Sequence, residues 1–161
     1  MQKAIFFDRD GVINSDEGLY YVFARADFRI NPGVIEFMKE VSRRGYLLIV
    51  ISNQGGIARG LYSKSDTDEL HQYFLQICSV EGIQVTEIYY CPHHSDFSNC
   101  LCRKPQSLML EKALARFDID PSLSYFVGDR ETDRQTATQA GVRTILIRPN
   151  SNLMEHISEV L

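Results

Sequence analysis

Two carboxylates, Asp8 and Asp10, stand two residues apart directly before Gly11. Carboxylates this close repel one another strongly unless a cation lies between them or one of them holds a proton. Both arrangements suit phosphoryl transfer, because Mg²⁺ prefers oxygen ligands and bridges to phosphate, and a carboxylate can attack as a nucleophile. A second, protonated carboxyl can donate to the leaving-group oxygen and later activate water. A pair of surface charges in a turn is the alternative interpretation, and this segment alone does not separate the two.

Three further polar groups offer complementary chemistry. The hydroxyl and amides of Ser52, Asn53 and Gln54 can hold phosphate oxygens, although such residues also form ordinary turns. Lys104 can neutralise the charge on a transferred phosphoryl group, and Arg103 can bind another part of the substrate. Two solvated cations are the simpler alternative for this pair.

Asp129 and Asp133 form the last acidic group. Asp129 is a candidate to complete a Mg²⁺ site, and Asp133, about one helical turn further on, is a candidate to support that site from behind. The alternative for Asp133 is an acidic residue near a helix N-terminus, where the helix dipole favours it.

The elements that must position these groups alternate between strand and helix. Short apolar runs predict strands, and the longer amphipathic segments between them predict helices. We expect strands at 3–7, 46–51, 85–90, 123–127 and 142–147, and helices beginning near Asn31, which is a candidate N-cap, and at 65–80, 106–117 and 131–140. This order predicts an α/β fold, a three-layer Rossmann-like parallel sheet with helices on both faces. The polar groups would then meet at the carboxyl ends of the strands.

The four groups, in this order and each beyond a strand, resemble the motifs of the haloacid dehalogenase superfamily over nearly the whole chain. The resemblance implies that Asp8 is the nucleophile and Asp10 the acid/base. It also implies Mg²⁺ bound by Asp8, the backbone carbonyl of Asp10, and Asp129, with Ser52 and Lys104 holding the phosphoryl group.

Cysteines and histidines cluster in residues 91–102. Cys91, His93, Cys100 and Cys102 give three thiolates and one imidazole, which satisfy tetrahedral Zn²⁺ and leave no open position, so the zinc would be structural. His94 competes for the imidazole position, and His93 is preferred because it fits the spacing of the family. The expected task of the zinc is to fix the loop that carries Arg103 and Lys104.

This loop is similar to that of a subgroup containing heptose 1,7-bisphosphate phosphatases and histidinol-phosphate phosphatases. The run 52–60 resembles the heptose enzymes more closely, whereas the short zinc loop is closer to the histidinol-phosphate type. The resemblance implies loss of the 7-phosphate from a heptose bisphosphate, with histidinol phosphate as the alternative substrate. Arg59 and Arg130 are further cations expected to contact substrate. The spaces between the motifs hold no cap domain.

Composition limits the remaining possibilities. The 161 residues suit one domain, with the zinc loop inside it, and the net charge of −4 argues against a broad nucleic-acid surface. A 3′-phosphate at a nucleic-acid end is therefore a more distant option. Apolar runs are too short for a membrane span, and the first residues lack the form of a signal peptide, so we expect a cytoplasmic monomer. A zinc-stabilised binding module without catalysis is the competing class, but it leaves the four motifs unexplained.

Overall fold

The computed structural model describes residues 1–160 and contains one five-stranded sheet in which every strand pairs in parallel. The strand order is β3-β2-β1-β4-β5, so the sheet grows outward from β1 in both directions. The strands are β1 (Lys3–Phe7), β2 (Tyr46–Asn53), β3 (Glu87–Cys91), β4 (Tyr125–Gly128) and β5 (Arg143–Leu146). The helices are α1 (Val34–Arg43), α2 (Lys64–Val80), α3 (Leu108–Arg116) and α4 (Glu131–Gln139), with short 3₁₀ turns at Arg25–Asp27, Pro121–Leu123 and Leu153–Glu159.

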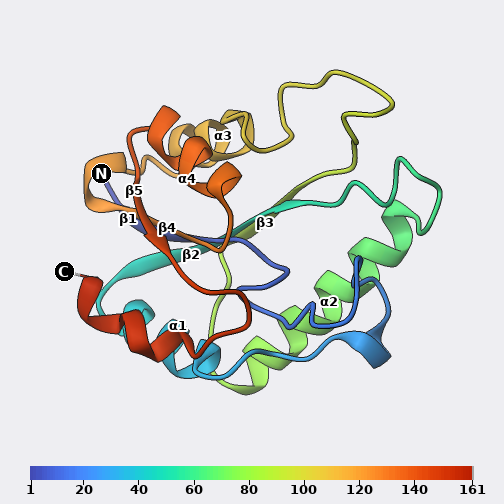
Figure 1. Ribbon diagram of the computed structural model, residues 1–161. Coiled ribbons are helices and arrows are strands. Elements are labelled where there is room, and N and C mark those ends of the chain that lie inside the picture. The colour runs from blue at the N-terminus through green and yellow to red at the C-terminus, as the bar shows by residue number, and fades with distance from the viewer. Residues whose placement is uncertain (161) are drawn as a thin grey trace.

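Helices cover both faces of the sheet, which confirms the predicted three-layer α/β fold. Figure 1 shows α3 and α4 on one side of the strands and α1 and α2 on the other. Each face has its own apolar core: one includes Phe37 of α1 and Phe74 of α2, and the other includes Leu110 of α3 and Ala137 of α4. Because β1 is buried on both faces, it consists almost entirely of apolar residues.

The ends of the helices explain most of their bounds. Ser63 caps α2 in a reciprocal pair with Asp66, whose backbone N–H lies 3.0 Å from Ser63 Oγ. The prediction that Asn31 caps α1 is wrong, because the N-cap is Gly33 in a left-handed conformation. The Asn31 amide instead donates to the carbonyl of Val12, 3.2 Å away, so a tertiary contact replaces the local cap.

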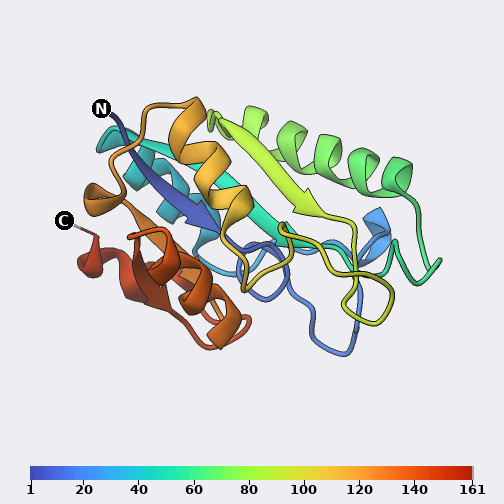
Figure 2. The same ribbon diagram turned by 90° about the horizontal axis from the view of Figure 1, so that it is seen from above.

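Outside the sheet and its four helices, residues 1–160 form mainly loops and short 3₁₀ turns. The segment between β1 and α1 is a loop with one 3₁₀ turn, and the segment between β3 and α3 is a loop without regular structure. Neither forms a cap domain, as predicted. No helix in the described chain combines the length and apolar character needed to cross a membrane. Figure 2 shows the loops that follow β1, β2 and β3 gathered at the arrowhead end of the sheet.

Candidate active site

The carboxyl ends of the three central strands bring the predicted acidic residues together. Phe7 pairs in register with Val127 of β4, so Asp8 and Asp129 follow strands that end at the same level. Gly11 allows the loop after β1 to approach, because its φ is +85° and a Cβ there would lie 2.4 Å from Asp129 Oδ2. A larger residue at this position would displace either the loop or the Asp129 carboxylate.

Lys104 lies at the centre of this acidic group. Its Nζ is 2.8 Å from Asp8 Oδ1 and 2.7 Å from Asp133 Oδ1, and the residue is only 4% exposed. Burial alone would lower the pKa of Lys104, but the Asp8 and Asp133 carboxylates outweigh it and hold that pKa above its usual value. The lysine is therefore a fixed positive charge beside Asp8.

Asn53 fixes the backbone of this lysine. Its amide oxygen accepts from Lys104 N at 2.9 Å, and its amide nitrogen donates to Lys104 O at 3.2 Å. Asn53 was predicted to contact phosphate. Although it lines the cleft, both polar atoms of its side chain are engaged with the lysine backbone. It joins the end of β2 to the loop that follows β3.

Asp8, Asp129 and Asp133 carry more negative charge than Lys104 alone can neutralise. Burial, followed by the nearby Asp133 carboxylate, raises the pKa of Asp8 well above its usual value and also raises the pKa of Asp129. Three carboxylates face one lysine, and the buried Asp129 Oδ1 has no hydrogen-bond partner among the described residues. A Mg²⁺ ion fits this set, since it would supply the missing charge and accept carboxylate oxygens as ligands.

Asp133 differs from its two acidic neighbours. One oxygen bonds Lys104, and the other accepts the backbone N–H groups of Asp129 and Arg130, each at 3.1 Å. These bonds at the start of α4 leave Asp133 as a support for Lys104 and Asp129. Both interpretations offered by the sequence therefore describe the same carboxylate, which caps a helix and also holds the site.

Asp10 lies at the edge of the cleft, with its side chain one-quarter exposed. Four donors reach its carboxylate, namely Nε and Nη2 of Arg9, Nδ2 of Asn14 and Nε2 of Gln54. Gln54 also donates to Ser52 Oγ and accepts from the hydroxyl of Tyr62. Gln54 and Ser52 are 1% exposed, so they line the floor beneath Asp10 rather than the open cleft.

The cleft includes residues that sequence reasoning missed. It is lined in part by Tyr20, Tyr21, His94 and Thr132, together with the predicted Arg103 and Arg130. The two adjacent tyrosines were a signal in the sequence, and Tyr20 is 83% exposed.

Arg59 is not among the described residues that line this cleft. Its guanidinium lies 3.1 Å from Asp96 and 3.2 Å from His94 Nε2. Arg59 therefore contacts the loop after β3, and its predicted contact with substrate stays a prediction.

Four candidate zinc ligands also converge, at the base of the cysteine loop (residues 91–102). Sγ of Cys91 lies 2.9 Å from Sγ of Cys102 and 3.7 Å from Sγ of Cys100, and Nδ1 of His93 is 3.3 Å from Cys102 Sγ. Three sulfurs and one imidazole this close match a tetrahedral zinc donor set. His94 points elsewhere, since its Nδ1 accepts from the backbone of Asp96.

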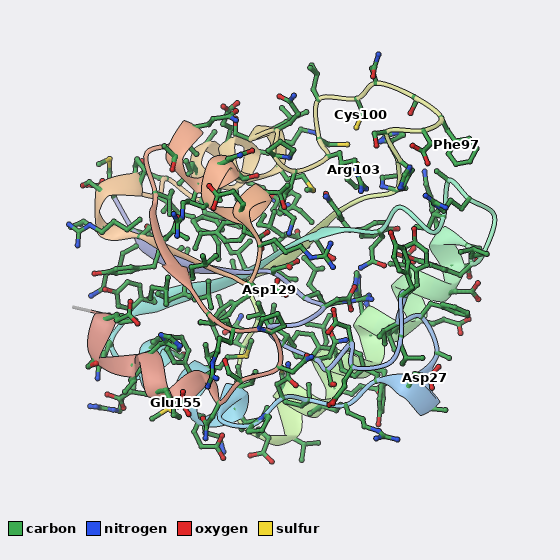
Figure 3. All side chains as sticks on the ribbon, in the orientation of Figure 1. Asp27, Phe97, Cys100, Arg103, Asp129 and Glu155 are labelled. Atoms are coloured by element: carbon green, nitrogen blue, oxygen red, sulfur yellow. The ribbon has the colours of Figure 1, made fainter. Side chains whose placement is uncertain are left out.

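The cysteine loop leads from this cluster to the two cations. Figure 3 shows Cys100 and Phe97 on the projecting loop, Arg103 nearer the body, and Asp129 toward the middle of the molecule. Arg103 Nη1 donates to the carbonyl of His93 at 3.2 Å, and its backbone N–H reaches Cys100 Sγ at 3.4 Å. The sulfur cluster and Arg103 therefore form one local unit.

Comparison with known proteins agrees with this geometry. A family model described as HAD-hydrolase-like matches residues 101–158. The chain is 41% identical over 145 residues to the D-glycero-alpha-D-manno-heptose-1,7-bisphosphate 7-phosphatase of Campylobacter jejuni, covering 90% of this chain and 81% of that one. It is 39% identical over 154 residues to the corresponding beta-anomer enzyme of Haemophilus influenzae, covering 92% and 83%.

A comparison with solved structures also finds a heptose bisphosphate phosphatase. The crystal structure of D,D-heptose 1,7-bisphosphate phosphatase from B. bronchiseptica, complexed with magnesium and phosphate, superposes with a TM-score of 0.83 at 30% identity, covering 99% of this chain and 87% of that one. The fold and the strand-end carboxylates therefore define a HAD-like phosphatase. Within that class, the chain belongs to the family of the heptose-1,7-bisphosphate 7-phosphatases.

Proposed function

We propose that this protein hydrolyses the 7-phosphate of D-glycero-D-manno-heptose 1,7-bisphosphate through an aspartyl-phosphate on Asp8. The observation that carries the proposal is the buried Asp8 carboxylate, paired with Lys104 and facing Asp129 at the ends of the central strands. The family to which the chain belongs supports the substrate.

The chemistry follows from these positions. A carboxylate oxygen of Asp8 attacks phosphorus, the bond from phosphorus to the sugar oxygen breaks, and Asp10 gives its proton to that oxygen. Water then attacks the phosphorus of the aspartyl-phosphate while Asp10 accepts a proton from that water, and the bond to Asp8 breaks to release phosphate. Lys104, held by Asp133 and Asn53, stabilises the charge on the phosphoryl oxygens.

Two metals complete the proposal. Asp8, Asp129 and the backbone carbonyl of Asp10 would hold Mg²⁺, which supplies the positive charge that the acidic group lacks. Cys91, His93, Cys100 and Cys102 would hold a structural Zn²⁺. Its role is to fix the cysteine loop, so that Arg103 and Lys104 enter the cleft in one conformation.

The cleft has no cap, so short loops must select the substrate. Arg103 and Arg130 line it as exposed or half-buried cations suited to the second phosphate of a bisphosphate. The buried Ser52 and Gln54 lie behind this lining, where Gln54 bonds both Ser52 and Asp10. Arg59 acts indirectly in this proposal, by holding Asp96 and His94. We further propose that residues 1–161 act as one cytoplasmic domain and as a monomer.

The decisive experiment compares kcat/KM for both anomers of the heptose bisphosphate and for histidinol phosphate, with ³¹P NMR to identify the phosphate released. We expect the heptose bisphosphate to be preferred and its 7-phosphate to be lost. Asp8→Asn should remain folded and lose activity by about 10⁴-fold or more. Preference for histidinol phosphate would overturn the substrate, and full turnover by Asp8→Asn would overturn the mechanism.

A further inference from the structure

Arg9, the residue between the two motif aspartates, is one of the largest fully buried side chains, at 1% exposure. A buried guanidinium is costly unless its N–H groups are bonded. Its Nε and Nη2 reach Asp10 Oδ1 and Oδ2, at 3.0 and 3.2 Å, in a two-point contact. Nη2 also donates to the carbonyl of Val22. Arg9 is thus held firmly against Asp10, although it does not itself line the cleft.

His71 of α2 holds the other end of the guanidinium. Its Nε2 lies 3.2 Å from Arg9 Nη1, and the imidazole is 5% exposed. Burial, assisted by the neighbouring positive charge of Arg9, lowers the pKa of His71 to about 3. The ring is therefore neutral, and Nε2 accepts the hydrogen bond from the arginine while Nδ1 carries the proton.

The remaining donors to Asp10 are uncharged. Nδ2 of Asn14 lies 3.0 Å from Oδ1, and Nε2 of Gln54 lies 3.2 Å from Oδ2. With the two bonds from Arg9, these amides occupy the four acceptor positions of a carboxylate. To carry a proton, Asp10 must exchange one donor for a leaving-group oxygen or a water. The amide bonds are weaker than the ion pair, so they are the ones to be exchanged.

We propose that Arg9 is the positioning residue of Asp10, and that His71 and the carbonyl of Val22 fix Arg9 for this task. The fork of the guanidinium keeps the plane of the Asp10 carboxyl constant while an amide bond is exchanged for the reacting oxygen. Lysine cannot replace it, because a single ammonium offers no planar two-point contact. The inference rests on the proposed acid/base function of Asp10.

The test uses the difference between leaving groups. A sugar oxygen leaves poorly and needs the proton from Asp10, whereas p-nitrophenolate leaves without help. The ratio kcat/KM reports the steps up to departure of this group. We expect Arg9→Met to lower kcat/KM about 30-fold or more for the sugar phosphate and less than about 3-fold for p-nitrophenyl phosphate. Arg9→Lys should behave like Arg9→Met, and the exposed Arg116→Met serves as the control.

Equal losses on the two esters, or no loss on either, would overturn the inference. If Arg9→Met lacks a cooperative thermal transition, His71→Leu takes its place. A loss of about 3-fold to 10-fold confined to the sugar phosphate then supports the positioning role, and equal losses refute it. Asp10→Asn separates the two proposals. If Asp10→Asn shows the selective loss and the Arg9 and His71 variants do not, only this inference fails; if Asp10→Asn does not show it, the proposed function fails.

Discussion

Two regions of the molecule position their functional side chains by different means. The strand-end site comprises Asp8, Lys104, Asp129 and Asp133, whereas the cysteine loop spans residues 91–102. At the strand ends, the register of β1 and β4 and the buried bonds of Lys104 place the carboxylates. The cysteine loop leaves the sheet after β3, and its described residues form no regular element before α3. Its base is organised by three sulfurs and one imidazole. The sheet therefore positions the carboxylates, whereas a cluster of candidate metal ligands lies at the base of the loop that completes the cleft.

The largest effect is expected at the centre of the strand-end site. Lys104→Met should lower kcat by about 10²-fold to 10³-fold, because it removes the one ammonium beside Asp8. It should also increase the rise in Tm that Mg²⁺ produces, since the cation then neutralises an acidic group that has lost its lysine. Lys39→Met, at an exposed ion pair with Glu81, is the control. An equal Mg²⁺-dependent shift in both variants would contradict this account.

A smaller effect is expected at the cysteine loop. Cys102→Ser should abolish zinc binding, measured by metal analysis, and lower kcat/KM about 10-fold to 100-fold. Limited proteolysis should then cut within residues 92–102, while the sheet remains folded by circular dichroism. Cys78→Ala is the control, because Cys78 is a buried thiol of the core cluster under α1 and α2. Zinc-free protein with unchanged activity would show that the loop needs no metal.

Asn53 lies between the two regions, so its substitution measures how tightly they are coupled. Asn53→Ala removes both amide contacts to the Lys104 backbone and should lower kcat/KM about 10-fold, with zinc content unchanged. The double variant Asn53→Ala/Cys102→Ser should lose less than the two single effects combined, because both act on the position of Lys104. Fully additive losses would mean that the two regions are independent.

The smallest expected effect is on the pH dependence of the free energy of unfolding, and it concerns His71, which contacts Arg9. Because the folded His71 has a pKa of about 3, against about 6.5 in an unfolded chain, the unfolded state binds an extra proton as pH falls. The free energy of unfolding should therefore decrease as pH drops from about 6.5 toward 3, and His71→Gln should flatten that decrease. Gln76→Ala, at an exposed and uncharged position of the same helix, should leave the slope unchanged. An unchanged slope in His71→Gln would show that another group dominates.

Much of the fold follows from local sequence patterns. Apolar runs gave the five strands, and β1 was predicted with its observed bounds, because a strand buried on both faces has a simple apolar signature. The pattern ended β2 too early, since Ser52 and Asn53 are polar but still pair with β3. The predicted N-cap of α1 was also wrong, because the side-chain amide of Asn31 bonds the carbonyl of Val12, nineteen residues away in sequence.

Some features of the active site could also be predicted from the sequence, whereas others depend on distant segments of the chain. Asp8, Asp129 and Lys104 could be predicted because each follows a strand whose end lies at the same edge of the sheet. The burial of Arg9 could not, since it depends on Val22 and on His71, which lie in distant segments. Nor could the engagement of Asn53 with the Lys104 backbone, which requires the loop after β3 to fold back.

The position of β3 has an evolutionary consequence. As an edge strand in the order β3-β2-β1-β4-β5, it pairs with β2 alone among the described strands, and its outgoing loop carries Cys100, Cys102, Arg103 and Lys104. Insertions or deletions between Cys91 and Lys104 would change the length of that loop without altering the inner strands that hold the carboxylates or the lysine beside them. Lineages can therefore diversify the substrates they accept through one peripheral module while inheriting the same reaction.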